Sequence, residues 1–355
     1  MPAVRRSDDD PFALLAAAAP LISCRQAEQV ARDHFGVTAT ARPLSAERDC
    51  NFHLTGGDRV EYVLKIDHPQ QDARVTDMQT RALRHIAVAQ ADLPVPRVCR
   101  ACAGGWAGTV DLGDGRRSTA RLLSYLPGVP MSQVDSTPGL RRQLGVHLAA
   151  LDRALYGFSH PAQDHCLLWD LKHAALLEPL ASRLPTGAQR RIALDHLDRF
   201  GRAIRPALEP LRRQVIYNDL NPSNVLVDPA DPGRITGMID FGDMVRSALI
   251  VDVAVAATYQ LRHTSNPFEA AAQLVGAYHR RQPLETGEIG LLFDLIVTRL
   301  IVAVLISTWR QALFPANAPY IMRNTRSNWQ MLQRIQAMRR EDVGQRLQAA
   351  CAADR

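Results

Sequence analysis

Three polar residues carry the chemistry that this sequence is equipped to perform. Asp219 and Asn224 lie five residues apart in a polar stretch between two apolar runs, and Asp240 follows at the end of a third apolar run. Transfer of a phosphoryl group from a nucleotide needs a carboxylate that accepts the proton of the attacking hydroxyl. It also needs hard oxygen ligands for the magnesium ions on the phosphates. The residue types therefore indicate phosphoryl transfer.

The spacing of these residues agrees with that chemistry. Kinase folds use an Asp, an Asn five residues later and a downstream Asp-Phe-Gly, and this chain continues from Asp240 as Asp240-Phe241-Gly242. Taken singly, Asp219 and Asn224 are equally explained as turn formers around Pro222, and Asp240 as a helix N-cap. The joint pattern, in a strand–loop–strand context, favours the catalytic interpretation.

A lysine upstream can take part in phosphoryl transfer only if a structural element holds it in position. Two strand-like runs, Asn51–Thr55 and Arg59–Ile66, are joined by the tight-turn sequence Gly56-Gly57-Asp58 and predict a β-hairpin. Alternation along the second run places Lys65 on a sheet face late in the strand. Only two of the 42 Lys and Arg residues are lysines, Lys65 and Lys172, so a retained lysine indicates a need for a compact ammonium. Lys172 has no such position and is predicted to be solvated.

The chain changes character at Pro127-Gly128. A helix is predicted at about 70–91 and an apolar strand over Ala120–Leu126, with a short Ala-rich helix over Phe12–Ser23 at the start. After the boundary long amphipathic helices dominate, at about 138–157, 164–183, 186–210, 248–263, 266–282, 286–313 and 325–350. The sequence therefore predicts an α+β chain with a small β-rich lobe and a larger helical lobe.

Composition excludes several classes of protein. The chain has 355 residues, 46% of them hydrophobic, and a net charge of +6 that is spread along the sequence, which gives no nucleic-acid footprint. Six cysteines without disulfide spacing favour a reducing cytoplasm. The apolar segment 291–309 is interrupted by Asp294 and Arg299, so no membrane span is predicted.

At these residues the sequence resembles the aminoglycoside phosphotransferase and choline kinase superfamily, which has a protein-kinase-like two-lobed fold. It looks most like the hydroxylysine kinase-like branch. The segments that carry the resemblance span about residues 44–330 and are Ser45-Ala46-Glu47-Arg48-Asp49-Cys50-Asn51-Phe52, Tyr62-Val63-Leu64-Lys65-Ile66, Leu151-Asp152-Arg153-Ala154-Leu155, Leu168-Trp169-Asp170-Leu171 and Asp240-Phe241-Gly242-Asp243-Met244-Val245.

The resemblance implies that different parts of the chain have different functions. Residues 1–123 form a nucleotide-binding lobe with leading helices over 1–40, residues 124–128 a hinge, and residues 129–355 a helical lobe with a catalytic loop at 215–227 and a metal-binding segment at 237–246. Asp219 becomes the catalytic base, and Asn224 and Asp240 the magnesium ligands. The expected ATP contacts are Lys65, Arg48, Asn51, Asp77, Ser124 and Leu126, with Glu47–Phe52 as a turn over the phosphates.

Two positions depart from the kinase pattern. Tyr217 stands where kinases have His, and because that residue is part of the scaffold we expect altered packing and unchanged chemistry. Kinases also orient the strand lysine with a Glu from the next helix. Here Asp77 is the residue expected to pair with Lys65.

The acceptor is less defined than the donor. The predicted function is ATP- and magnesium-dependent transfer to a hydroxyl of an amino acid or amino alcohol, such as one like hydroxylysine, homoserine, choline or ethanolamine. Asp243, Trp169, Asp170 and Tyr320 are the residues expected at an acceptor amine, although Trp169 can equally be a buried anchor and Asp170 an arginine partner. An antibiotic phosphotransferase and a nucleotide-binding pseudokinase with a regulatory or scaffolding role are the alternatives.

Overall fold

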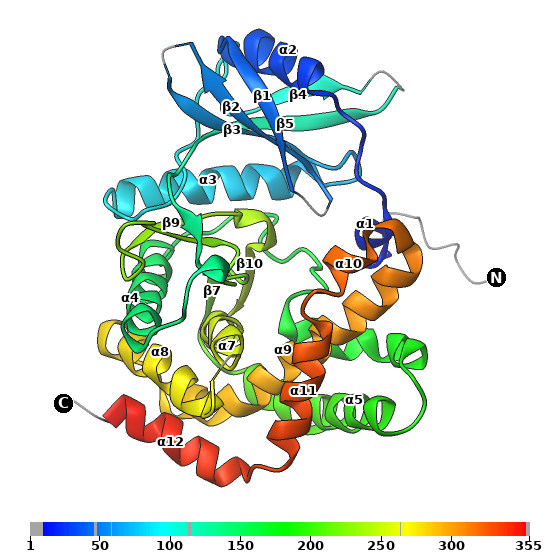
Figure 1. Cartoon of the computed structure of the whole chain (residues 1–355), viewed down its shortest axis with the longest axis vertical. Helices are drawn as coiled ribbons and strands as arrows, with labels where there is room; N and C mark the ends of the chain where they lie inside the picture. The colour runs from blue at the N-terminus through cyan, green and yellow to red at the C-terminus, as the bar shows by residue number, and fades with distance from the viewer. Residues whose placement is uncertain (1–9, 46–47, 58, 113–114, 263, 353–355) are drawn as a thin grey trace. The chain divides into compact units, whose positions relative to one another are not determined.

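The protein forms two compact units. The computed structural model describes residues 10–45, 48–57, 59–112, 115–262 and 264–352. One unit comprises Met1–Pro127 with His160–Ala162, and the other comprises Gly128–Ser159 with Gln163–Arg355. The first is built on a β-sheet and the second is mostly helical (Figure 1). The α+β, two-lobed fold is therefore confirmed.

An antiparallel five-stranded sheet forms the centre of the first unit. Its strands run in the order β1 (Ala39–Leu44), β2 (Cys50–Gly56), β3 (Glu61–Ile66), β5 (Arg117–Ser124) and β4 (Gly108–Asp111). The pairing of β2 with β3 confirms the predicted hairpin, and its register places Asn51 opposite Lys65. On its other side β3 pairs with β5, where Arg121 is opposite Lys65.

Helices cover this sheet. Helix α2 (Cys24–Phe35) packs its apolar face, which includes Ala27 and Phe35, into the same buried cluster as Phe52 of β2. Helix α3 (Ala73–Ala89) lies on the other side of the sheet from α2 (Figure 1). The predicted helix over Phe12–Ser23 is wrong for most of its length, because α1 spans only Ala13–Ala16 and has no side-chain cap.

The second unit contains two small sheets among helices. Strand β7 (Arg213–Ile216) pairs antiparallel with β10 (Val245–Ala248), and β6 (Val129–Pro130), β8 (Val225–Val227) and β9 (Ile235–Met238) form the other sheet. The longer helices are α4 (Pro138–Ala154), α5 (Ala188–Arg199), α7 (Leu249–Gln260), α8 (Pro267–Arg281), α9 (Thr286–Leu313), α11 (Thr325–Gln336) and α12 (Arg340–Ala352). Shorter helical segments are η2 (Met131–Gln133), η3 (Leu171–Arg183), η4 (Phe200–Ile204), α6 (Arg205–Leu208), η5 (Phe241–Asp243), η6 (Pro315–Asn317) and α10 (Ala318–Ile321).

Helix α9 is the core helix of this unit. In the part of the chain that the structure describes, it is the one helix long and apolar enough to cross a membrane. Its most apolar window is 83% buried inside the protein, and it packs against α7, η3 and α11. Burial by neighbouring helices explains the apolar composition of α9.

Two of the predicted helices differ from the observed elements. The segment 164–183 is helical only over η3, which is a 3-10 helix with Pro179 inside it. Proline lacks the backbone N–H that an α-helix needs at an interior position. The predicted helix 325–350 is broken between α11 and α12 by a turn at Ala337-Met338.

Candidate active site

The loop between β7 and β8 holds the carboxylate of Asp219 in a fixed orientation. Asn221 and Asn224 donate side-chain N–H groups to Oδ2 of Asp219 over 2.9 and 2.8 Å. The carbonyl oxygen of Asp219 accepts from the backbone N–H of Asn221 at 2.7 Å and from Nδ2 of Asn224 at 3.1 Å. Because Nδ2 of Asn224 points to Asp219, its Oδ1 is the atom that can serve as a hard oxygen donor to a cation.

The segment that carries Asp240 is tied to this loop. The backbone N–H of Ile239 donates to the carbonyl oxygen of Asn224 over 2.9 Å. The hydroxyl of Tyr217 donates to the carbonyl oxygen of Ile239, and the Tyr217 ring meets the Phe241 ring edge-on at a centroid distance of 4.9 Å. Tyr217 is fully buried, so it acts as the packing residue that the sequence predicts for this position.

Both loops contain a non-glycine residue in the left-handed backbone region. Asn218 has φ 67°, and Asp240 has φ 60°. This conformation costs energy for most L-residues, but Asn and Asp adopt it more readily than the others. Such a conformation persists only where the surrounding structure enforces it. The direction of the carboxylates at Asp219 and Asp240 is therefore set by a constrained backbone.

Asp252 on α7 enforces the conformation around Asn218. Its two carboxylate oxygens accept the backbone N–H groups of Tyr217 and Asn218, each over 2.8 Å. Asp252 is fully buried, and burial raises its pKa to about 6, against the effect of these two hydrogen bonds. The catalytic loop is thus fixed from behind by a buried carboxyl group.

A second buried carboxyl group, Asp152 on α4, is hydrogen bonded to Asp252. Oδ2 of Asp152 also accepts from the hydroxyl of Tyr278 on α8 over 2.7 Å. Burial and the charge of Asp252 raise the pKa of Asp152 well above its ordinary value. Two carboxylates this close do not both ionise, so the pair shares a proton.

Arg299 is a site residue that the sequence interpretation missed. From α9 it donates through Nη2 to Oδ1 of Asp219 at 3.0 Å and to the hydroxyl of Tyr259 at 3.1 Å. Nη1 donates to the carbonyl oxygen of Trp169 at 3.2 Å, and the guanidinium lies over the Trp169 ring. Arg299 is 2% exposed. The sequence does contain one signal that could have identified Arg299: it is a charged residue in the middle of an apolar segment, and a buried charge needs a partner.

The environment of Asp219 combines opposing charges. Burial raises the pKa of Asp219 to about 7, while Arg299 opposes that rise and the charges of Asp243 and Asp240 add to it. The side chain is 20% exposed, so the carboxylate is accessible. A carboxyl group whose pKa lies near neutral pH is suited to accept a proton in catalysis.

The donor set at this site suits magnesium. In the described residues no group of three or more His, Cys, Asp or Glu side chains is arranged to hold a metal ion. Magnesium, however, usually takes one or two protein oxygen ligands and completes its shell with water and phosphate oxygens. The amide oxygen of Asn224 and the carboxylate of Asp240 fit that requirement.

Lys65 lies on the sheet of the first unit as predicted. It is 7% exposed, with Asn51 and Arg121 as its cross-strand neighbours. Oδ1 of Asn51 is buried without a hydrogen-bond partner in the described structure. Arg48 lies two residues before β2, and Glu47, part of the predicted phosphate turn, lies outside the described residues.

The predicted pairing of Asp77 with Lys65 is wrong. Asp77 instead forms ion pairs with Arg81 at 2.8 Å and with His160 at 3.0 Å. Arg81 follows Asp77 by one helical turn, so α3 supplies this partner locally. The role of the kinase Glu is not filled by Asp77.

The predicted hinge residues lie at the end of β5. Ser124 is the last residue of this strand and accepts the backbone N–H of Arg97 through its hydroxyl at 2.9 Å. Its own N–H donates to the carbonyl oxygen of Arg97 at 2.8 Å. Leu126 follows as a partly buried residue outside the strand.

The residues expected at an acceptor have different surroundings. Trp169 is partly buried under Arg299, and Asp243 is partly buried at the end of η5. Tyr320 on α10 is 36% exposed and stacks against the guanidinium of Arg323 at 3.8 Å. Asp243 is the one whose charge acts on Asp219.

Asp170 is already engaged within the protein, and this corrects the prediction for Lys172. The fully buried Asp170 accepts from the hydroxyl of Ser247 at 2.8 Å and forms an ion pair with Lys172 at 2.9 Å. Lys172 also donates to the carbonyl oxygen of Arg246 at 2.6 Å. The prediction of a solvated Lys172 is wrong because Asp170 caps η3 and Lys172 folds back onto it.

The second unit carries a carboxylate beside two oxygen donors, and the first unit carries a lysine on its sheet; phosphoryl transfer requires these residue types. The family described as "Phosphotransferase enzyme family" matches residues 40–285, and the chain belongs to it. It is 28% identical to the hydroxylysine kinase of Mus musculus over 343 residues, which cover 90% of this chain and 91% of the relative. The predicted resemblance to the aminoglycoside phosphotransferase and choline kinase superfamily is thereby confirmed.

Solved structures confirm the kinase-like fold. Amicoumacin kinase matches with a TM-score of 0.62 at 16% identity, over 86% of this chain and 88% of that chain. A microcompartment-associated aminopropanol kinase matches with a TM-score of 0.60 at 18% identity, over 86% of this chain and 98% of that chain.

Proposed function

We propose that the protein is an ATP- and magnesium-dependent kinase that transfers the γ-phosphoryl group to a hydroxyl of a small amino alcohol or amino acid. The observation that carries the proposal is the setting of Asp219. Its Oδ2 is held by Asn221 and Asn224, and its Oδ1 by Arg299. Two of the similar proteins are named hydroxylysine kinase and aminopropanol kinase, and these names support this class of acceptor.

In this mechanism Asp219 accepts the proton of the acceptor hydroxyl. The new bond forms between that oxygen and the γ-phosphorus, the bond from the γ-phosphorus to the bridging oxygen breaks, and ADP leaves. Arg299 keeps Asp219 ionised and orients it. Magnesium, held by Asn224 and Asp240, supplies charge neutralisation on the phosphates.

The first unit supplies the remaining nucleotide contacts in this proposal. Lys65 pairs with the α- and β-phosphates, and Asn51 and Arg48 support the phosphates. Ser124 and Leu126 contact the adenine. A cytoplasmic location stays a prediction.

Among the predicted acceptor residues, Asp243 is the strongest choice for an ammonium group. Its charge acts on Asp219, where the reacting hydroxyl must lie. The rings of Trp169 and Tyr320 already stack with the guanidinium groups of Arg299 and Arg323, so they are weaker choices for a cation. Asp170 is left out because Lys172 and Ser247 already satisfy it.

An ADP-release screen tests the function directly. Wild-type protein with MgATP is offered hydroxylysine, homoserine, choline, ethanolamine, sugars and aminoglycosides. We expect turnover with an amino acid or amino alcohol and none with the Asp219→Asn variant. Turnover with aminoglycosides alone identifies an antibiotic kinase. A nucleotide-dependent thermal shift with no turnover on any acceptor supports the pseudokinase instead.

The chemistry required of Lys65 gives a second test. Lys65→Arg keeps the charge but replaces a compact ammonium with a planar fork in a buried position. We expect kcat/KM for MgATP to fall at least tenfold. Near-normal kcat/KM in Lys65→Arg contradicts a direct role at the phosphates.

A further inference from the structure

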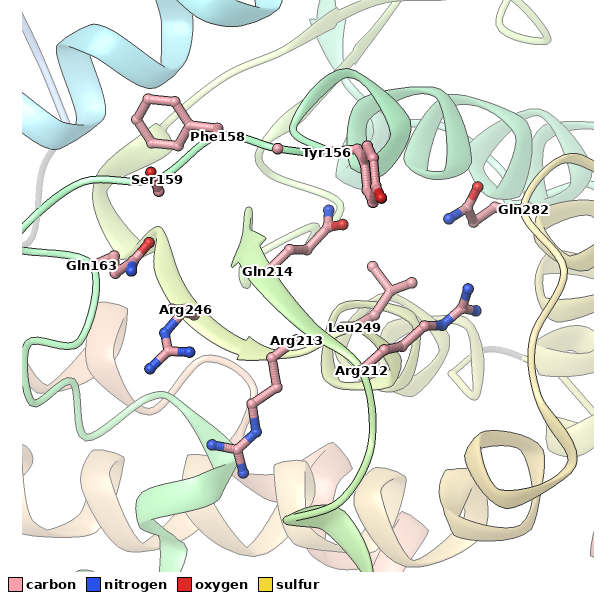
Figure 2. Close-up of a pocket in the computed structure, with 11 residues that line it drawn as sticks. Tyr156, Phe158, Ser159, Gln163, Arg212, Arg213, Gln214, Arg246, Leu249 and Gln282 are labelled. Atoms are coloured by element: carbon pink, nitrogen blue, oxygen red, sulfur yellow. The ribbon is translucent and has the colours of Figure 1, made fainter.

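A cavity of about 420 Å³ lies in the second unit, and none of the loop residues Asp219 to Asn224 lines it; Figure 2 shows the residues that do. Strands β7 and β10, the turn after α4 and the first residue of α7 surround it. Its polar lining consists largely of arginine and glutamine side chains, namely Arg212, Arg213, Arg246, Gln163, Gln214 and Gln282. No carboxylate is among the residues that line the cavity, so the polar side chains there are cations, amides and the hydroxyl groups of Ser159 and Tyr156.

Two of the three arginines are neutralised by acids outside the cavity lining. Arg212 donates to both carboxylate oxygens of Glu288, at 2.7 and 2.8 Å. Arg246 donates in the same bidentate way to Asp164, at 2.8 and 3.0 Å. These pairs fix both side chains but add no net charge.

Arg213 has no acid of its own: its charge also acts on Asp164, but Arg246 forms the ion pair with that carboxylate. The side chain of Arg213 is exposed and makes no hydrogen bond or ion pair with any residue that the structure describes. The register of β7 and β10 puts Arg213 opposite Ala248, and Arg246 opposite Val215. Arg213 and Arg246 are therefore diagonal neighbours on one face of the strand pair. The cavity thus carries a surplus of one positive charge.

The rest of the lining is apolar and partly aromatic. The ring of Tyr156 is 78% exposed, and Phe158 and Leu249 also line the cavity. Small-molecule sites combine such apolar walls with a few polar groups that fix the orientation of the ligand, and they begin at about 300 Å³. An arginine fork matches the geometry of carboxylate and phosphate oxygens.

We propose that this cavity binds a small organic anion, a carboxylate or a phosphate monoester with an apolar body, and that Arg213 is its anchoring residue. Arg213 holds the oxyanion, and Tyr156 and Phe158 contact the apolar body. A single surplus charge suits a ligand with one anionic group.

The cavity has a direct connection to the catalytic loop. Gln214, which lines it, donates to the carbonyl oxygen of Asp152 over 2.7 Å. Asp152 is hydrogen bonded to Asp252, which holds the backbone of Tyr217 and Asn218. An occupant of the cavity therefore lies beside a residue that is linked, through Asp152 and Asp252, to the backbone that precedes Asp219.

Binding of simple probes tests the site independently of activity. The probes are benzoate, phenyl phosphate and the neutral benzyl alcohol, titrated into the full-length protein and followed by ligand-observed NMR. The variant is Arg213→Ala. Arg191→Ala is the matched control, because it removes an exposed arginine from α5, outside the cavity. Saturating MgATP is added in a parallel series so that binding at the nucleotide site is excluded.

We expect at least one of the two anions to bind saturably with MgATP present, and benzyl alcohol to bind at least tenfold more weakly. Arg213→Ala should weaken anion binding at least tenfold, and Arg191→Ala should leave it unchanged. A preference for benzoate or for phenyl phosphate identifies the anionic group. Equal binding of both anions by Arg213→Ala and the wild type, or no saturable binding of either anion, overturns the proposal.

Discussion

One carboxyl group lies on the catalytic loop and two lie behind it, and the two sets are stabilised in opposite ways. Asp219 faces the site and is bonded to the cation Arg299. Asp252 and Asp152 lie behind the loop and share a proton, with a tyrosine hydroxyl and backbone N–H groups as further partners. Burial raises the pKa in both sets.

The difference shows how carboxyl groups in similar surroundings serve two purposes, proton transfer and support of the backbone. A carboxylate that must accept a proton needs to be ionised and accessible, so a buried arginine beside it opposes the desolvation. A carboxyl pair that only holds the backbone can keep a proton, because a pair that shares one proton carries a single negative charge and costs less to bury than two charges. Each set can be disturbed separately by substitution.

Removing the base should have the largest effect. Asp219→Asn keeps the shape of the side chain but cannot accept a proton, so we expect kcat to fall by about 10²–10⁴. The MgATP thermal shift should persist. The control is Asp198→Asn, which should keep normal kcat. Asp198 is an exposed acid on α5 that pairs with Arg202. A similar loss in both variants argues against a catalytic role.

Substitutions in the carboxyl pair should separate the two partners. Asp252→Ala leaves two buried backbone N–H groups without acceptors, so we expect the free energy of unfolding to fall by about 2–5 kcal/mol. Asp152→Asn supplies an amide N–H in place of the shared proton and should cost about 1 kcal/mol or less. Urea denaturation measures both. An equal loss of unfolding free energy in the two variants contradicts a proton shared between Asp152 and Asp252.

Arg299 should affect turnover more than nucleotide binding. Arg299→Gln removes the cation from Oδ1 of Asp219, and we expect kcat to fall about tenfold or more, equivalent to about 1.4 kcal/mol. The Kd for MgATP should change little. Arg310→Gln is the control, because Arg310 is equally buried on the same helix but contacts the Phe314 ring. An effect on the Kd alone contradicts the positioning of Asp219.

The last prediction concerns the dependence of stability on pH. The pKa of Asp219 is about 7 in the folded protein, against about 3.9 in an unfolded chain. Between these values the folded state binds more protons, so raising the pH destabilises the wild type relative to Asp219→Asn. The difference should change by up to about 1.4 kcal/mol per pH unit from pH 4 to 7 and then level off. Urea titrations without metal measure it, and a constant difference contradicts the raised pKa.

The chemistry that depends on local sequence could be predicted. Asp219, Asn224 and Asp240 were found because they lie next to apolar strands at a defined spacing from one another, and the structure ties their two loops together. Lys65 was placed on a sheet face because alternation along a strand is a local property. The hairpin of β2 and β3 followed from its turn.

Partners that come from distant elements could not be predicted. Arg299 reaches Asp219 from a helix eighty residues away, and no periodicity reveals that contact. Asp77 was assigned to Lys65 by analogy, but a residue one turn along its own helix is a closer partner. Lys172 was misplaced because its segment forms a 3-10 helix around Pro179, which changes the direction of its side chains.

The scarcity of lysine makes this protein unusually simple to footprint. Lys65 is 7% exposed, and the side chain of Lys172 is 18% exposed with its ammonium engaged by Asp170. An acylating reagent that modifies amines therefore has two side-chain targets, and mass spectrometry can follow each one. On the proposed function, MgATP protects Lys65 and leaves Lys172 unaffected, so the ratio of the two products reports nucleotide occupancy with an internal standard.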